Sequence, residues 1–217
     1  MNRSSKIIAS LVAIAIFGAF AVSQLPNGGP GSMAGMKMST SDTSLSTKAF
    51  ETAMSGMMKN MMSPATGKAD LDFVQGMLPH HQGAIDMAKV VLQYGKAPEI
   101  KKLAEGVVKA QEGEISAMNE WLTKTDKATL PQSPESAKAN DQAMATMMKN
   151  MTSTYTGNAD VDFVKGMIPH HQGAIDMAKV ALQYAKDPVL LKLAGDIVSA
   201  QEGEISFMNE WLKKNGQ

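Results

Sequence analysis

The segment ADLDFVQGMLPHHQGAIDMAKVVLQY, residues 69–94, decides the fold because it returns almost unchanged at residues 159–184. The copies differ at four positions: Leu71/Val161, Gln75/Lys165, Leu78/Ile168 and Val91/Ala181. Residues 110–122 and 200–212 also match, with one difference at Ala117/Phe207. A repeat this long indicates a duplicated domain rather than a solenoid of short units. Each copy, at roughly 80 residues, is large enough to form a small domain, or the two copies could share one core.

Apolar residues at helical spacing predict three α-helices in each copy. In the first copy, the expected helices cover residues 47–62, 70–95 and 98–122. Asp70 is a plausible N-cap of the second helix, and Pro98 suits the first turn of the third. Pro79 and Pro169 interrupt the second helix of each copy, so we expect a kink or a restart there. Strand signals are missing from the sequence, which predicts an all-α protein built as helical bundles.

Every histidine of the chain lies in the repeated segment: His80, His81, His170 and His171. The polar residues of the second helix recur at spacings of three and four and predict its water-facing side: Asp72, Gln75, Pro79, Gln82, Asp86, Lys89 and Gln93. Both histidines lie on the opposite, apolar side, which also presents Met77 and Met87. A lone histidine in such a place is usually a hydrogen-bonded core residue. Two adjacent histidines flanked by methionines favour a metal site instead.

The third helix carries a carboxylate within its expected core-facing stripe of Leu103, Val107, Ala110, Glu114, Met118 and Trp121. Burying an unpaired carboxylate is costly, so Glu114 and its counterpart Glu204 each need a partner. A histidine N–H would serve and would orient the imidazole, as outer-shell partners do in metal sites. A lysine, an arginine or partial exposure would also serve. Met118 and Met208, one turn further on, are either core residues or ligands.

The first helix of each copy carries a methionine stripe at the i, i+3, i+4, i+7 positions. The two stripes are Met54, Met57, Met58 and Met61, and Met144, Met147, Met148 and Met151. Such stripes are usually core filler or an adaptable binding groove. Thioether sulfurs on successive turns also offer several sites for a soft monovalent ion. We expect the stripes to bind such ions here.

The amino-acid composition limits which metal ions the protein could bind. The chain has no cysteine and 19 methionines, so disulfides and thiolate sites are excluded while thioether and imidazole donors abound. Cu(I) is the first candidate, with Ag(I) as a surrogate, because soft donors select soft ions. A di-iron Glu-x-x-His pair, a His-Glu-x-x-His zinc motif, a nucleophile elbow and a phosphate-binding loop are all missing. We therefore do not expect an enzyme.

The predicted organisation is a signal peptide or N-terminal anchor, a flexible methionine-containing tether, a first repeat, a linker and a second repeat: residues 1–23, 24–46, 47–123, 124–136 and 137–217. Arg3 and Lys6 precede an apolar run typical of an export signal, and an uncleaved anchor is the alternative. The tether's Gly, Ser, Pro and Thr content cannot bury enough apolar surface to fold. Its three methionines either capture metal loosely or are incidental: Met33, Met36 and Met38.

Removal of residues 1–23 leaves 21 − 2 = 19 basic residues against 21 acidic ones. A nearly neutral chain has no basic field to hold nucleic acid or an anionic membrane surface. We expect contact with a membrane only if the N-terminal segment is not cleaved.

The motif Met-x-Pro-His-His-Gln-Gly-Ala-Ile-Asp-Met, followed by Gln-x-x-Glu-Ile-x-x-Met, resembles the ferritin-like family known as a domain of unknown function. These motifs stand at residues 77–87 and 111–118, and again at 167–177 and 201–208. The resemblance covers residues 47–215 and implies duplicated three-helix units forming ferritin-like helical bundles. A duplicated, methionine-rich, exported member is similar to copper-binding proteins of that family, which implies periplasmic placement and copper bound by Met and His.

The predicted function is sequestration of several Cu(I) ions outside the cytoplasm, in copper tolerance or trafficking. We predict one mixed site per copy, namely Met77, His80, His81, Met87 and Met118, and Met167, His170, His171, Met177 and Met208. Glu114 and Glu204 would be outer-shell partners or ligands, and the methionine stripes would add thioether sites. A copper exporter or another periplasmic copper protein is the expected protein partner. A metal-free interaction module that binds partner helices through its methionine faces is the alternative, and a copper redox enzyme is a weaker one.

Overall fold

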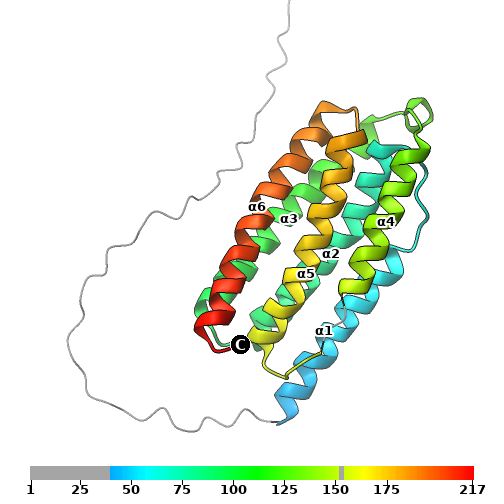
Figure 1. Ribbon diagram of the computed structural model, residues 1–217. Helices are drawn as coiled ribbons and strands as arrows, with labels where there is room; N and C mark the ends of the chain where they lie inside the picture. Colours follow the sequence, from blue (N-terminus) through cyan, green and yellow to red (C-terminus); the bar gives the residue numbers. More distant parts are fainter. Residues whose placement is uncertain (1–39, 152–153) are drawn as a thin grey trace, which may run out of the picture. The chain divides into compact units, whose positions relative to one another are not determined.

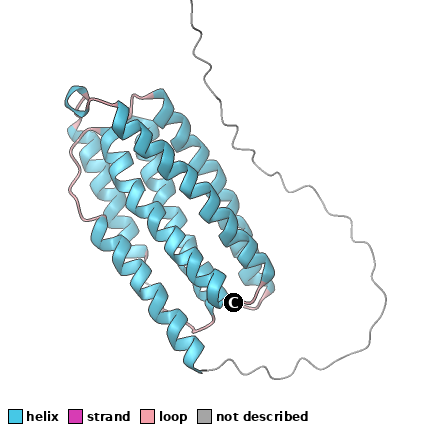
Figure 2. Cartoon of the chain, turned by 180° about the vertical axis from the view of Figure 1, so that it is seen from behind, coloured by secondary structure: helices cyan, strands magenta, loops and turns pink. Residues whose placement is uncertain are grey.

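The computed structural model describes residues 40–151 and 154–217, which form α-helices joined by short loops and contain no strand (Figure 2). The helices are α1 (Thr40–Asn60), α2 (Ala69–Tyr94), α3 (Pro98–Lys124), α4 (Pro134–Asn150), α5 (Ala159–Tyr184) and α6 (Pro188–Lys214), with a short 3₁₀ turn, η1 (Lys127–Thr129). The all-α prediction is confirmed, with three α-helices in each copy.

Helices α2 and α5 form the centre of the bundle and pack against each other (Figure 1). On one side, α3 covers α2 and α6 covers α5. On the other side, α1 packs on α2 and α4 packs on α5. The central helices are antiparallel, because the Met87 end of α2 lies beside Gly166 and the Met177 end of α5 lies beside Gly76. Their apolar side chains belong to one continuous core, so the two repeats share a single core.

The loop that precedes each central helix is held by an aspartate one turn inside the helix. Asp72 accepts hydrogen bonds from the backbone N–H and hydroxyl of Thr66, at 2.7 and 2.6 Å, and from the N–H of Gly67 at 2.9 Å. Asp162 does the same for Thr156 and Gly157. Gly67 has a φ of +80°, a backbone conformation that glycine adopts without steric cost. The sharp turn before α2 therefore depends on the Thr-Gly pair and its aspartate.

Asp70, predicted to be the N-cap of α2, has a different role. The N-cap residue is Lys68, without a side-chain cap. The carboxylate of Asp70 reaches the other repeat, where it accepts from the backbone N–H of Asp187 at 2.8 Å and of Lys186 at 3.1 Å. Asp160 is its counterpart and accepts from the N–H groups of Lys96 and Ala97. Each central helix thus begins by tying down the loop that follows the other one.

The two tryptophans make a second pair of contacts between the repeats. The indole N–H of Trp121 in α3 donates to Asp187 at 2.9 Å, and that of Trp211 in α6 donates to Glu99 at 2.9 Å. Asp187 corresponds to Ala97 in the first copy, and Glu99 corresponds to Val189 in the second. The two indoles therefore find carboxylates at non-equivalent positions of the repeat.

Most helix ends lie within two residues of the predictions, but the helices depart from them in three larger respects. Helix α1 begins at Thr40, so the last seven residues assigned to the tether are helical. Helices α2 and α5 run through Pro79 and Pro169 without a restart. Helix α4 begins at Pro134, where Ser133 caps it, and Ser133 N–H donates to Gly67 O at 2.7 Å. The linker thus ends earlier than predicted and is tied to the loop before α2.

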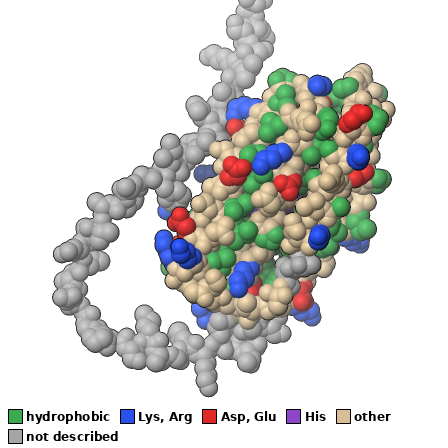
Figure 3. Space-filling view, viewed as in Figure 1, with side chains coloured by type: hydrophobic (Ala, Val, Ile, Leu, Met, Phe, Trp, Pro, Cys, Tyr) green, Lys and Arg blue, Asp and Glu red, His purple; other side chains and the backbone are tan. Residues whose placement is uncertain are grey.

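The signal segment and the remainder of the tether, residues 1–39, lie outside the described residues. Within the described ranges, none of the helices combines the length and apolar character that crossing a bilayer requires. Lysine and acidic side chains are interspersed on the face shown in Figure 3, in keeping with the near-neutral composition. The predicted polar side of α2 is confirmed, since none of its residues is buried.

Candidate metal centre

The centre of the bundle is occupied by two histidines, one from each repeat. His80 of α2 and His170 of α5 face each other with ring centroids 3.8 Å apart and ring planes inclined by 50°. Both side chains are fully buried, at 0% exposure. None of their four ring nitrogens makes a hydrogen bond of good geometry with the described residues. A backbone group of the facing histidine raises the pKa of each ring, but this is the smallest of the influences on it. Buried polar atoms are rarely left in this state, and four together at one point are candidate ligand atoms.

The surroundings of this pair keep both imidazoles neutral. Burial lowers the pKa of His80 well below its usual value, and the neighbouring His170 lowers it further. Burial is also the main cause that lowers the pKa of His170, followed by the neighbouring His171. A neutral imidazole has a lone pair to offer, and it is the form that binds metal ions. The pair is thus in the protonation state that a metal site requires.

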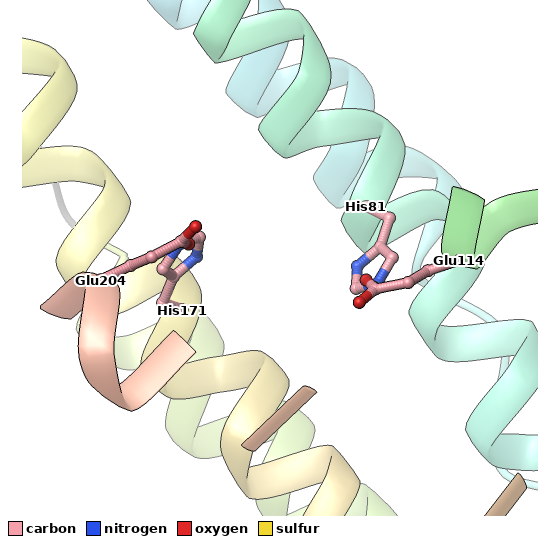
Figure 4. Close-up of polar contacts among 4 residues, drawn as sticks. All are labelled: His81, Glu114, His171 and Glu204. Atoms are coloured by element: carbon pink, nitrogen blue, oxygen red, sulfur yellow. The ribbon is translucent and has the colours of Figure 1, made fainter. Parts of the chain in front are cut away.

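The adjacent histidines each contact a glutamate. His81 Nε2 lies 2.7 Å from Glu114 Oε2, and His171 Nε2 lies 2.6 Å from Glu204 Oε2 (Figure 4). The glutamate side chains are 20% and 26% exposed, whereas both histidines are fully buried. The contact with a carboxylate favours the tautomer that carries its proton on Nε2. The Nδ1 atoms then hold the lone pairs, and they have no partner in the described part of the chain.

Histidine is the partner of both glutamates, and both carboxylates are also partly exposed, as the alternative allowed. The His171–Glu204 contact is a hydrogen bond, whereas the His81–Glu114 contact has the distance of an ion pair without hydrogen-bond geometry. The four imidazoles form a row through the core, with centroid distances of 6.3 Å from His81 to His80 and 6.2 Å from His170 to His171. Among the described residues, no three His, Asp or Glu side chains converge closely enough to hold an ion by themselves.

Glycines bring methionine side chains onto the histidine-bearing faces of the central helices. A Cβ at Gly83 would lie 2.7 Å from the sulfur of Met57, and one at Gly173 would lie 2.8 Å from that of Met147. Gly83 and Gly173 follow His80 and His170 by three residues, so they share a helix face with them. Because glycine has no side chain, the thioethers of Met57 and Met147 can pack directly against the backbone of Gly83 and Gly173.

A second pair of glycines admits methionines from the opposite repeat. A Cβ at Gly76 would lie 3.3 Å from the sulfur of Met177, and one at Gly166 would lie 2.9 Å from the methyl carbon of Met87. Gly76 and Gly166 precede the central histidines by four residues, one helical turn. Each central histidine thus has a methionine of its own repeat within about one turn on one side and a methionine of the other repeat on the other side.

Most of the other predicted methionines are buried. Exposure is 8% or less for Met54, Met57, Met61, Met77, Met87, Met118, Met147, Met151, Met167, Met177 and Met208. Met58, Met144 and Met148 are partly buried against the same core. The stripes of α1 and α4 therefore serve as core filler, and their metal binding stays a prediction.

The reading of α3 was wrong at one position and missed another. Ala110, predicted to face the core, is exposed, and Gln111 is buried in its place. Gln201 is the equivalent buried residue of α6, and neither amide oxygen has a partner among the described residues. The spacing of Ile100, Ala104 and Val107 extends to Gln111, so this register was available in the sequence. The prediction missed this register because glutamine is polar and was not counted as a core residue.

Comparison with known proteins places the chain in a family. The protein belongs to the DUF305 family, a domain of unknown function, which matches residues 70–212. This confirms the resemblance drawn from the repeated motifs.

Solved structures of CopM are similar to it. The silver-soaked form is 34% identical, with a TM-score of 0.53 over 70% of this chain and 98% of that one. The Cu(I)-bound form is 36% identical, with a TM-score of 0.53 over 67% of this chain and 96% of that one. A DUF305 protein of Streptomyces coelicolor, described as secreted, is 28% identical, with a TM-score of 0.55 over 70% of this chain and 96% of that one.

An uncharacterised protein of Acanthamoeba polyphaga mimivirus, L153, is 45% identical over 53 residues. The matched segment is 24% of this chain and spans about a third, 35%, of that viral protein.

Proposed function

We propose that this protein is an exported copper-binding protein that sequesters several Cu(I) ions, and Ag(I) in their place, through methionine and histidine. The observation that carries the proposal is the buried His80–His170 pair, whose four nitrogens have no partner among the described residues while methionines pack one turn away. Neutral imidazole and thioether together suit a soft monovalent ion. When bound, such an ion would supply the partner that these nitrogens lack.

The similarity to CopM supports the same role. CopM has been solved in Cu(I)-bound, Cu(II)-bound and silver-bound forms, and about two thirds of this chain aligns with it. We propose that the imidazoles and Met77, Met87, Met118, Met167, Met177 and Met208 bind copper here. Glu114 and Glu204 orient His81 and His171, as outer-shell carboxylates do. The stripes of α1 and α4 would provide thioether-only sites. The role is binding rather than catalysis.

Copper toxicity outside the cytoplasm is the process that such a protein would limit. The signal-like residues 1–23 and the secreted description of the Streptomyces coelicolor relative support export. A copper exporter or another exported copper protein would be the partner that delivers or receives the ion.

Native mass spectrometry of the chain without residues 1–23 tests this function. After incubation with Cu(I), Ag(I), Cu(II) and Zn(II) and exhaustive dialysis, we expect several Cu(I) or Ag(I) ions to be retained and little Zn(II). A folded protein that keeps neither Cu(I) nor Ag(I) would refute the proposal.

The pH profile of Cu(I) release separates the two kinds of site. Protons compete for imidazole nitrogen but not for thioether sulfur, so release should occur in two steps as the pH falls. Because burial lowers the pKa of His80 and His170, their step should lie below the ordinary histidine pKa of about 6.5. Loss of every ion in one step would rule out thioether-only sites.

The alternative of a metal-free interaction module requires methionines on an exposed face. Met57, Met61, Met147 and Met151 of the stripes are instead buried, at 1–5% exposure. Met58, Met144 and Met148 are partly buried, and Met62, beside the first stripe, is 78% exposed. Replacing all four histidines would leave partner binding intact under that alternative.

A further inference from the structure

We propose that Met62 is a modification site, at which hydrogen peroxide converts the thioether to methionine sulfoxide while the bundle stays folded. Its side chain is 78% exposed, in the loop between α1 and α2. Among the described residues, every other methionine is buried or partly buried. The proposal goes beyond metal binding and does not depend on it.

Two adjacent methionines at the end of α1 have opposite environments. The N–H of Met61 donates to Met57 O at 3.1 Å, which continues the helical pattern, and the side chain of Met61 is 4% exposed. Met62, the next residue, is directed to solvent, and Ser63 and Pro64 after it are exposed as well. The two thioethers therefore share one stretch of backbone and differ in their access to solvent.

Access to solvent controls the reaction because the oxidant must touch the sulfur. A lone pair of the thioether attacks one oxygen of hydrogen peroxide, so that an S–O bond forms while the O–O bond breaks. The sulfur loses two electrons, and the departing hydroxide takes the proton of the transferred oxygen and leaves as water. An exposed thioether reacts in this way from the native state, whereas a buried one reacts only after local opening of the structure.

The product is compatible with the fold at Met62 alone of this adjacent pair. A sulfoxide oxygen is a strong hydrogen-bond acceptor, and water supplies its partner at an exposed position. At Met61 the same oxygen would be a polar atom within the apolar core, which is costly. Oxidation of Met62 therefore leaves the packing unchanged, and the exposed sulfoxide remains open to the methionine sulfoxide reductases that reverse it.

The modification site belongs to the first repeat only. The position equivalent to Met62 is occupied by Thr152 in the sequence, and a threonine has no sulfur to oxidise. The equivalent of Met61 is Met151, which is 5% exposed. The two copies thus share the buried thioether and differ in the exposed one.

The test measures the rate of sulfoxide formation at each methionine of the metal-free chain without residues 1–23, in an excess of hydrogen peroxide. Trypsin releases residues 60–68 as one peptide that contains both Met61 and Met62, and fragment ions assign the added oxygen to one of them. We expect Met62 to react at least about tenfold faster than Met61, because Met61 must wait for local opening. Met62 should also react before the partly buried methionines, namely Met58, Met144 and Met148. Equal rates at Met61 and Met62, or a partly buried methionine that reacts first, would overturn the proposal.

The same reaction in urea is the matched control. In the unfolded chain, Met61 and Met62 should react at similar rates, and a preference for Met62 that persists in urea would contradict control by the fold. The urea midpoint of the folded protein should be the same before and after oxidation of Met62, and the same again in Met62→Leu. A lower midpoint after oxidation, or a sulfoxide that the reductases of both epimer specificities do not repair in the folded protein, would also count against the proposal.

Discussion

At the scale of single residues, two adjacent histidines of α2 have different neighbours. Both are fully buried, but His81 Nε2 lies 2.7 Å from Glu114 Oε2, whereas His80 faces the ring of His170. An unsatisfied buried polar group costs about 1–3 kcal/mol, and an apolar residue of the same shape does not carry that cost. Two neighbouring residues of one motif therefore differ in the side chains that they contact.

We predict that His80→Leu stabilises the metal-free protein by about 1–3 kcal/mol while reducing its retention of Cu(I). The gain arises because leucine fills the same space without unpartnered nitrogens. Urea unfolding in the presence of a chelator measures the free energy of unfolding.

His81→Leu is the matched control, at the next position of α2, where the histidine is also fully buried. Here the substitution removes the partner of Glu114, and we expect a loss of about 1 kcal/mol, because that carboxylate is 20% exposed and regains water. Equal effects of the two substitutions would show that the contacts do not distinguish these histidines.

The pH dependence of stability follows from the same burial. The pKa values of His80 and His170 are lowered in the folded protein, so below about pH 6.5 the unfolded chain takes up protons that the folded protein does not. Stability is therefore present above about pH 6.5 and is lost as the pH falls toward the folded pKa values. The expected slope is about 1.4 kcal/mol per pH unit for each histidine, or about 2.7 for both.

Urea unfolding of the metal-free protein at several pH values between 7.5 and 5 measures this slope. The double variant His80→Leu/His170→Leu should lose this part of the pH dependence and keep the contribution of all other groups. An unchanged slope in that variant would show that the two imidazoles are protonated in the folded protein.

The sequence pattern and the motifs predicted much of this site, but they did not predict that His80 and His170 face each other. The polar stripe of α2 placed both histidines on the buried side, and the glutamate in the α3 stripe required a partner, which His81 supplies. Periodicity reports which face of a helix is apolar and not which helix covers it. The contact between His80 and His170 therefore emerges only when the two copies are packed together.

At the scale of helices, glycine positions determine how closely α1 approaches α2. A Cβ at Gly83 would lie 2.7 Å from Cγ and 2.8 Å from Cβ of Met57, atoms near the backbone that cannot move aside easily. We predict that Gly83→Ala destabilises the protein by about 1–3 kcal/mol, because the overpacking outweighs the gain in helix propensity. Thermal or urea unfolding of the metal-free chain measures this change.

Gly106→Ala is the control within an equally helical segment. Gly106 is exposed in α3, and nothing lies within 4 Å of the position of its missing Cβ. Alanine should therefore stabilise the helix by up to about 1 kcal/mol. Stabilisation by both substitutions would show that a Cβ at position 83 does not clash with Met57.

Helix existence was predictable, and helix bounds less so. Apolar spacing predicted three helices per copy, but the start of α1 at Thr40 lies within a polar stretch whose composition suggested a tether. A Cβ at Gly95 would lie 2.5 Å from Asp160 Oδ1 and from the carbonyl oxygen of Val91, and 2.7 Å from a methyl carbon of Val91. The second copy has alanine at both equivalent positions, 181 and 185, which removes only the contact with the methyl carbon.

At the scale of the whole bundle, the ends of the central helices join the two repeats. Asp70 and Asp160 each hold the loop after the opposite central helix, and the indoles of Trp121 and Trp211 each donate to a carboxylate of the opposite repeat. Together with the shared apolar core, these contacts mean that each repeat depends on the other for part of its hydrogen bonds and part of its core packing. The two repeats therefore form one structural unit.

We predict that both repeats unfold in one cooperative transition. The chain has two tryptophans, one in each repeat, so Trp121→Phe and Trp211→Phe each leave a single fluorescent reporter. In each variant, the urea midpoint from fluorescence should coincide with that from helical circular dichroism, as two-state unfolding requires. Adding Asp160→Ala, which removes the acceptor of the Lys96 and Ala97 N–H groups, should lower both reporters' midpoints together. Two separated transitions, or a shift seen by one tryptophan only, would mean that the repeats unfold independently despite their common core.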